Sequence, residues 1–109
     1  MSRDINREIQ ELIDNNTVVL LLKGEKGSAM CGFSQQILTI FEEFEEKYNI
    51  KFKVVNVWKD QILYDALKEF NDWPTYPQVF VNHEFVGGFD IINEMYNDSE
   101  LENLVSQIE

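Results

Sequence analysis

The chain has 109 residues, a formal net charge of −11 and a single cysteine. This length predicts one domain, spanning residues 1–109, whose core needs no disulfide. The excess of carboxylates argues against nucleic acid and membrane surfaces as partners, because phosphate groups attract Lys and Arg and repel acids. One cysteine and an opening segment without an apolar leader favour a reducing compartment; we expect the cytoplasm, or an organelle if a leader has been removed.

Apolar spacing predicts the secondary structure of the first half. Residues 5–13 carry apolar side chains at helical intervals, and the two asparagines at 15–16 end this helix. Residues 17–23 form a nearly unbroken apolar run, which is typical of a strand covered on both faces. After a glycine-bearing loop, a helix of about four turns follows from an apolar stripe, made of Phe33, Ile37, Phe41, Phe44 and Tyr48. Its other face carries Glu42, Glu43, Glu45 and Glu46 and is interpreted as solvated, with a docking surface as the alternative.

The second half predicts a second strand, a helix, a hairpin and a helical tail, over residues 52–58, 62–70, 78–88 and 90–109. Asn82 and His83 are expected at the turn of the antiparallel hairpin. Ser99 is expected to cap the last helical segment, because Glu102 follows at the spacing of a capping box. A βαβ unit followed by a ββα unit gives an α/β fold with one mixed four-stranded sheet flanked by helices.

Cys31 lies where a strand, a glycine-bearing loop and a helix start are predicted to meet. The unpaired N–H groups of the first helical turn, together with the charge of Lys23, favour a thiolate at this position. The alternative is a small buried apolar residue without chemistry. Ser34 stands where a two-cysteine motif has its second thiol, so a redox cycle at Cys31 needs an outside thiol such as glutathione. Alternatively, Ser34 is a first-turn residue with no chemical role.

A single thiolate can also serve as a metal ligand. A [2Fe–2S] cluster takes four ligands, usually thiolates, and one chain supplies one cysteine. Two chains and two glutathione molecules would complete such a ligand set.

Two further segments contain groups that suit a binding site. In "DWPTYPQVF", a cis bond before Pro77 would expose main-chain groups of Tyr76 to an extended peptide-like ligand, whereas a trans bond would make an ordinary turn. In "GGFD", the glycines allow close approach of a ligand, Asp90 can accept from an ammonium, and neighbouring N–H groups can hold a carboxylate. The alternative is a strand end followed by a helix cap.

The remaining candidate side chains favour structural roles. His83 is interpreted as an exposed hairpin residue and not as a ligand. Trp58 and Trp73 are interpreted as core residues. The residues left over assemble no zinc pattern, phosphate loop or serine triad.

Three motifs occur in order along nearly the whole chain: "KG" six residues before "CGFS", then "WPTYPQ", then "VGGFD". With these motifs the sequence resembles the monothiol glutaredoxins of the CGFS type, which have a thioredoxin-like fold. The resemblance implies that Cys31 is the redox residue and the ligand of a cluster and of glutathione. The candidate residues for holding glutathione are Lys23, Phe33, Tyr64, Thr75, Tyr76, Pro77, Gly88, Phe89 and Asp90.

The resemblance also implies an assembly and a role in iron handling. Two chains would form a homodimer that bridges a [2Fe–2S] cluster with two cysteines and two glutathiones. The cluster would then pass to acceptor proteins.

Three positions depart from the family pattern. Ala29 stands where relatives often have proline, which predicts a looser loop before Cys31. Phe89 replaces a small or sulfur-bearing residue, and its ring would either crowd the glutathione pocket or pack beside it. Tyr64 stands where many relatives have an arginine for the glycine carboxylate of glutathione, which predicts a weaker hold on that end.

Three functions remain open from the sequence. The first is a glutathione-dependent carrier of [2Fe–2S] clusters. The second is an enzyme, at most a weak one, that reduces mixed disulfides between proteins and glutathione through Cys31. The third is a docking module cut from a longer protein.

Overall fold

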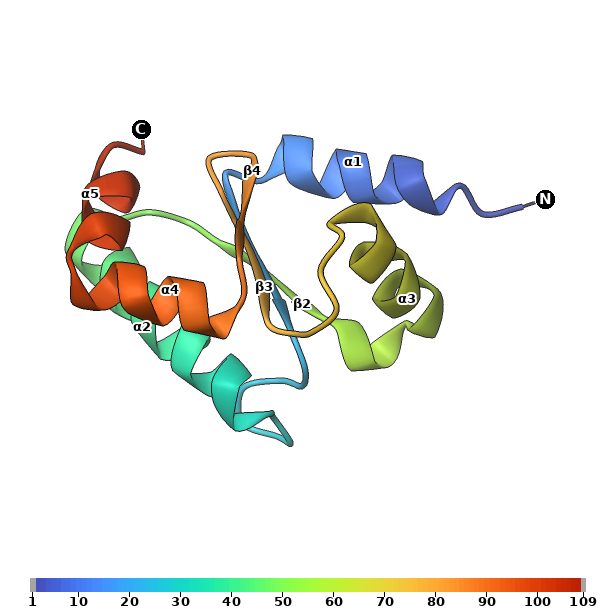
Figure 1. Cartoon of the computed structure of the whole chain (residues 1–109), viewed down its shortest axis with the longest axis horizontal. Helices are drawn as coiled ribbons and strands as arrows, with labels where there is room; N and C mark the ends of the chain where they lie inside the picture. Colours follow the sequence, from blue (N-terminus) through green and yellow to red (C-terminus); the bar gives the residue numbers. More distant parts are fainter. Residues whose placement is uncertain (1, 109) are drawn as a thin grey trace.

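A mixed four-stranded sheet separates two layers of helices in the computed structural model, which describes residues 2–108 (Figure 1). The strands are β1 Val18–Leu22, β2 Lys53–Asn56, β3 Gln78–Val81 and β4 Glu84–Gly87. They lie in the order β2-β1-β3-β4, with β1 and β2 parallel and the other neighbours antiparallel. The predicted fold class, with its βαβ and ββα units, is therefore confirmed.

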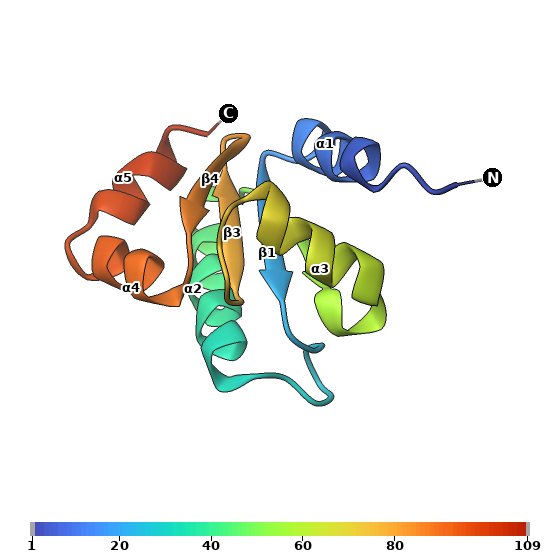
Figure 2. The same ribbon diagram turned by 45° about the vertical axis from the view of Figure 1, so that its right-hand side comes forward.

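The helices divide between the two faces of this sheet. One face is covered by α1 Ile5–Asn15 and α3 Gln61–Phe70 (Figure 1). The other face is covered by α2 Gly32–Tyr48, α4 Phe89–Asn97 and α5 Glu100–Ser106, as Figure 2 also shows. Within residues 2–108, none of these helices is both long and apolar enough to cross a bilayer.

Strand β1 lies at the centre of the molecule because both of its faces are apolar. Val18, Leu20 and Leu22 belong to the core shared with α2, α4 and α5. Val19 and Leu21 point the opposite way, as the two-residue repeat of a strand requires, and join the core shared with α1 and α3. All five side chains are buried, which confirms the prediction of a strand covered on both faces.

The strand predicted over residues 52–58 ends earlier than expected. β2 stops at Asn56, and a short 3₁₀ turn, Val57–Lys59, follows. The Asn56 side-chain oxygen accepts from the backbone N–H groups of Gly24 and Trp58, each at 3.0 Å, and so ends the strand with a turn. Trp58 is left 52% exposed, and its interpretation as a core residue is therefore wrong.

The capping box predicted around Ser99 is absent. Ser99 has a left-handed backbone (φ 68°) and its side chain makes no capping bond. The carboxylate of Asp98 accepts from the Glu100 N–H at 2.9 Å in its place. Glu102 accepts from the Tyr48 hydroxyl at 2.8 Å, so a contact with α2 outcompetes the local motif.

The predicted hairpin is confirmed. Asn82 and His83, both at positive φ (54° and 69°), form the turn between β3 and β4, as two-residue hairpin turns require. His83 is exposed, and its Nδ1 lies 2.8 Å from the carbonyl oxygen of Ile13.

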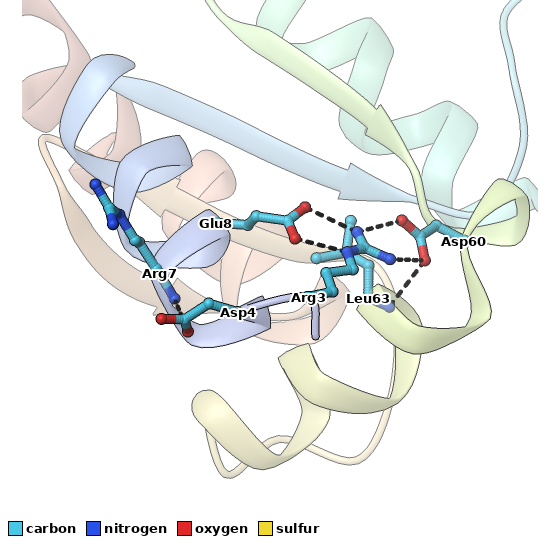
Figure 3. Close-up of polar contacts among 6 residues, drawn as sticks. All are labelled: Arg3, Asp4, Arg7, Glu8, Asp60 and Leu63. Carbon is cyan, nitrogen blue, oxygen red and sulfur yellow. Dashed lines mark hydrogen bonds and ion pairs between the residues drawn. The ribbon is translucent and has the colours of Figure 1, made fainter. Parts of the chain in front are cut away.

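Arg3 joins the two helices that cover one face of the sheet (Figure 3). Its guanidinium forms a forked pair with Glu8 of α1, at 2.6 and 2.9 Å, and a second forked pair with Asp60, at 3.0 and 2.6 Å. Hydrogen bonding to the Arg3 guanidinium lowers the pKa of both carboxyl groups. The contact links residues far apart in sequence.

The same two helices carry carboxylate caps at their N-termini (Figure 3). Asp4 accepts from the Arg7 N–H of α1 at 3.2 Å. Asp60 accepts from the Leu63 N–H of α3 at 3.1 Å while it also holds Arg3. These N-terminal N–H groups are satisfied within the protein.

Candidate functional site

The loop after β1 returns the chain to the end of that strand. Gly24 has φ 111°, and a Cβ there would lie 2.2 Å from the Ala29 carbonyl oxygen, so only glycine fits. Gly24 also forms an isolated antiparallel bridge with Met30. The Cys31 N–H then donates to the Lys23 carbonyl at 2.9 Å. These contacts place Cys31 beside the end of β1.

Two ion pairs fix the middle of this loop to its surroundings. Glu25 pairs with Lys59, in the 3₁₀ turn after β2. Lys26 pairs with Glu42 on α2. Because both pairs lie at the surface, each contributes little to the stability of the fold, and their main effect is on the position of the loop.

Cys31 is the N-cap residue of α2, and its thiol is partly exposed. Several groups lower its pKa. The largest contribution is the backbone N–H of Ser34, followed by that of Phe33 and then the charge of Lys23, while burial opposes them. The predicted direction of the shift is confirmed, although the helix terminus contributes more than Lys23 does. Because the thiol is partly exposed, Cys31 is not the small buried residue of the alternative interpretation.

Ser34 has a structural role that the sequence left open. Its side chain is fully buried, and its oxygen accepts from the Lys23 N–H at 3.0 Å. Ser34 therefore fastens the first turn of α2 to the end of β1. Its hydroxyl also makes a small contribution to lowering the pKa of Cys31.

The segment before β3 presents main-chain groups beside Cys31. The Tyr76–Pro77 bond is cis, as predicted. The Tyr76 side chain is buried, and its hydroxyl donates to the Tyr64 carbonyl at 2.7 Å. This anchor turns the side chain of Tyr76 away into the core, while the residue still lines a pocket with Thr75 and Cys31.

Gln78 supports this segment, and the sequence analysis assigned it no role. It is fully buried at the start of β3. Its amide nitrogen lies 3.2 Å from the carbonyl oxygens of both Trp73 and Thr75, and its oxygen accepts from Asn71 at 2.8 Å. The polar residue after "TYP" in the motif was the signal available in the sequence.

The turn before α4 requires glycine for a steric reason. A Cβ on Gly88 would lie 2.8 Å from Nε1 of Trp73 and 3.3 Å from the Pro77 carbonyl oxygen. The buried Nε1 of Trp73 has no hydrogen-bond acceptor in the described part of the chain. Trp73, interpreted as a core residue, in fact lines the pocket and packs against this turn.

A pocket of about 450 Å³ brings most of the candidate residues together. They come from the end of β1, the starts of α2 and α4, and the segment before β3. The lining residues are Lys23, Cys31, Phe33, Trp73, Thr75, Tyr76, Gly88, Phe89 and Asp90.

Tyr64 and Pro77 do not line this pocket. The Tyr64 ring lies on α3 with its centroid 4.8 Å from that of Tyr76, and the Lys68 ammonium lies 4.4 Å from the Tyr64 centroid. Pro77 is buried, with its carbonyl oxygen near the backbone of Gly88.

The two phenylalanines of the pocket contact each other. The centroids of Phe33 and Phe89 are 4.8 Å apart, with an interplanar angle of 42°. Phe33 is 54% exposed, which differs from the other members of the apolar stripe that predicted α2. Phe89 thus lines the pocket with its ring against that of Phe33.

The pocket contains few charged side chains and few side chains that could bind a metal ion. Lys23 and Asp90 both line it, and neither forms an ion pair within residues 2–108. No group of three His, Cys, Asp or Glu side chains in this part of the chain could hold a metal ion. The site therefore offers one thiol of lowered pKa, one cation and one carboxylate around the pocket.

Comparisons with known proteins identify the family of this chain. The glutaredoxin family model matches residues 18–86. The probable monothiol glutaredoxin 2 of Rickettsia felis is 42% identical over 97 residues, which cover 89% of each chain. Its counterpart in Rickettsia prowazekii is 40% identical over 109 residues, covering 99% of this chain and 98% of that protein. The chain therefore belongs to the glutaredoxin family, within its monothiol group.

Solved structures show the same fold. Reduced poplar apo GrxS14 superposes with a TM-score of 0.78 at 35% identity, covering 94% of this chain and 91% of that one. A buckwheat glutaredoxin–glutathione complex superposes with a TM-score of 0.79 at 19% identity, covering 94% and 88%. These neighbours confirm the thioredoxin-like architecture.

Proposed function

We propose that this protein binds glutathione in the pocket around Cys31 and, as a cluster-bridged homodimer, carries [2Fe–2S] clusters to acceptor proteins. The observation that carries the proposal is a single thiol of lowered pKa in a pocket with no second soft ligand. A lone thiolate neither closes a disulfide within its chain nor completes a metal site by itself. Both possible uses of this thiol therefore require an added thiol.

The pocket suits a small peptide that bears a thiol and opposite charges. Lys23 can meet a carboxylate, and the main chain of Thr75 and Tyr76 can pair with an extended peptide backbone. Asp90 can accept from an ammonium, and α4 begins at Gly88 without a side-chain cap, so its first N–H groups can receive a carboxylate. Glutathione combines these groups with a central thiol, and the buckwheat neighbour was solved as a glutathione complex.

The ligand chemistry of the cluster fits the same site only when two chains combine. Four thiolates are the usual ligands of a [2Fe–2S] cluster. Cys31 from each of two chains would supply two of them, and the thiolates of two bound glutathiones would supply the others. The cluster is cargo in this proposal, and the exposed position of Phe33 beside Cys31 leaves this face accessible to a second chain.

The assignment extends to the organisation and location of the protein. We treat residues 1–109 as a single glutaredoxin domain acting in the cytoplasm. Denaturing mass spectrometry of the cellular protein, compared with the 12.9 kDa chain, would reveal any flanking domain.

Anaerobic reconstitution tests the proposal. The protein is incubated with iron, sulfide and glutathione, and its visible spectrum and mass are measured. We expect a brown dimer with one cluster per two chains, and a colourless monomer for Cys31→Ser or when glutathione is omitted. A Cys31→Ser variant that retains a stoichiometric cluster would refute the proposal.

The lowered pKa of Cys31 favours a second function, the reduction of mixed disulfides between proteins and glutathione. The Cys31 thiolate would attack the glutathione sulfur and release the protein as a thiolate, which takes up a proton. A second glutathione thiolate would then attack the Cys31–glutathione disulfide, giving oxidised glutathione and restoring the Cys31 thiolate.

Stopped-flow measurement of both half-reactions, with a glutathionylated peptide and then with free glutathione, separates this function from cluster transport. We expect turnover that disappears in Cys31→Ser but is too slow to compete with cluster transfer. Fast turnover together with failed reconstitution would reverse the ranking of the two functions.

A further inference from the structure

A second cavity lies at the opposite end of β1 from Cys31. Val18, the first residue of β1, lines this distal cavity, whereas Lys23, which follows the last residue of β1, lines the pocket with Cys31. The distal cavity measures about 700 Å³, which is within the range of small-molecule sites. Its walls come from the end of α1, the segment between α2 and β2, and Ile108. Binding of glutathione at Cys31 leaves it unused.

The charged side chains around the distal cavity are all cationic. No Asp or Glu within residues 2–108 lines it, although the chain has 20 of them. Lys51 and Lys53 both line it, and both are exposed. Phe52, which separates them, packs into the core against Phe41, with the ring centroids 6.4 Å apart. Two ammonium groups therefore border a cavity that contains no neutralising carboxylate.

These two lysines are also left without a counter-charge by the fold. Five of the nine Lys and Arg residues form ion pairs within residues 2–108, namely Arg3, Arg7, Lys26, Lys47 and Lys59. Lys68 lies against the ring of Tyr64. The remaining three, Lys23, Lys51 and Lys53, each line one of the two pockets. Because a net charge of −11 repels anions from most of the surface, these are the places where an anion can bind.

We propose that the distal cavity binds a small organic anion with at least two negative charges, and that Lys51 and Lys53 are its cationic contacts. The amides of Asn15 and Asn49 and the hydroxyl of Thr17 also line the cavity and can donate hydrogen bonds to the same ligand. Phosphate and carboxylate groups share this chemistry. The site is separate from that of glutathione, so both ligands can be bound at once.

A structural role for the two lysines makes a different prediction. α1 ends at Asn15 and α2 ends at Tyr48, both at this cavity, and helix C-termini carry partial negative charge. If the lysines only offset that charge, replacing them would lower the melting temperature and no anion would raise it. A ligand of the folded state raises the melting temperature, and this rise should be smaller in the lysine variants.

The experiment titrates the 15N-labelled full chain with citrate and with pyrophosphate at constant ionic strength. We expect at least one of these anions to shift the backbone amide signals of Thr17, Asn49 and Lys53, while those of Ser34 and Asp90 at the other pocket stay in place. Binding of citrate alone would assign the site to carboxylates, and binding of pyrophosphate alone would assign it to phosphates. Binding of both would show that charge decides.

Three matched variants test the contacts. Lys51→Gln and Lys53→Gln each remove one exposed cation and should each weaken binding by up to about fivefold. Lys68→Gln removes the same charge from α3, outside the distal cavity, and should leave the affinity unchanged. Equal weakening by all three variants would show general charge attraction and overturn the site. It would equally be overturned if neither anion shifts any signal, or if the shifts are confined to the pocket around Cys31.

Discussion

Two helix N-termini on one face of the sheet have carboxylate caps, and two on the other face do not. On one face, α1 and α3 start with Asp4 and Asp60, whose carboxylates accept from backbone N–H groups. On the other face, α2 and α4 start with Cys31 and Gly88, which provide no side-chain capping bond. Asp60, the cap of α3, also holds Arg3, whereas the uncapped ends border the pocket. Donors left unused by the fold are available for a thiolate and a ligand.

Removing a cap from the structural face should have the largest effect on stability. Asp60→Ala loses the capping bond to Leu63 and the contact with Arg3, and should lower the free energy of unfolding by about 1 to 2 kcal/mol. Urea denaturation measures the change. Asp60→Asn keeps a capping oxygen and should lose less. An Asp60→Ala variant with unchanged stability, or with an altered pKa of Cys31, would contradict the division between capped structural ends and uncapped functional ends.

Adding a cap to the functional face should stabilise the fold while it removes the thiol. Cys31→Asp would cap α2 as Asp60 caps α3, and should be more stable than Cys31→Ala by about 1 kcal/mol. Thermal unfolding of the two variants measures this difference, and neither variant should retain a cluster. Equal melting temperatures would show that the start of α2 needs no capping acceptor.

A substitution at Tyr64 tests whether a side chain on α3, the helix on the capped face, can bind glutathione in the pocket. Tyr64→Arg would provide a forked donor for the glycine carboxylate of glutathione, which a phenol cannot supply. We expect up to about 1 kcal/mol, or about fivefold tighter glutathione binding, and slower loss of cluster at low glutathione. Added salt should reduce the gain. An unchanged affinity at low ionic strength would show that position 64 does not reach the ligand.

The smallest effect concerns the cation beside the thiol. Lys23→Ala should raise the pKa of Cys31 only slightly, because the N–H of Ser34 contributes more than the charge of Lys23. Alkylation rates measured against pH give this value. A rise that restores the ordinary thiol pKa would show that the charge of Lys23, and not the uncapped helix end, activates Cys31.

The lowered pKa also fixes how Cys31 affects stability as pH changes. A folded-state pKa below the unfolded value of about 8.5 adds stability that is complete above that value and is lost as pH falls through the folded pKa. The stability difference between wild type and Cys31→Ala should therefore shift in favour of wild type as pH rises through this window. Urea denaturation across the window checks the sign.

The sequence predicted the parts of the molecule that depend on local pattern. The apolar run 17–23 and the turn at Asn82 and His83 indicated a central strand and a hairpin, and both are confirmed. The motifs around Cys31, Tyr76 and Gly88 converge on one pocket because the sheet order brings the ends of their elements together.

Long-range contacts decided what the sequence could not predict. The bond from Asn56 to Gly24 crosses between segments and turns Trp58 outward. The pairing of Arg3 with Asp60 likewise joins residues whose proximity no local pattern indicates. Each depends on the completed sheet, so it could not be inferred from spacing alone.

Two aromatic side chains near the pocket also differ from their predicted positions. The sequence pattern predicts a core position for Trp73, yet this residue lines the pocket and makes glycine necessary at position 88. Tyr64 is a candidate residue from the sequence, yet it is absent from the pocket lining and its ring contacts that of Tyr76. In both cases the side-chain direction depends on packing between α3, the segment before β3, and β4.

Backbone amide shifts on addition of S-methylglutathione test the central claim, that the uncapped helix ends border a glutathione site. We predict shifts at the N–H groups of Ser34, Tyr76 and Asp90. The N–H groups of Arg7 and Leu63, which are bonded to carboxylate caps, should stay in place. Shifts confined to Arg7 and Leu63, or no shifts at saturating ligand, would contradict the account.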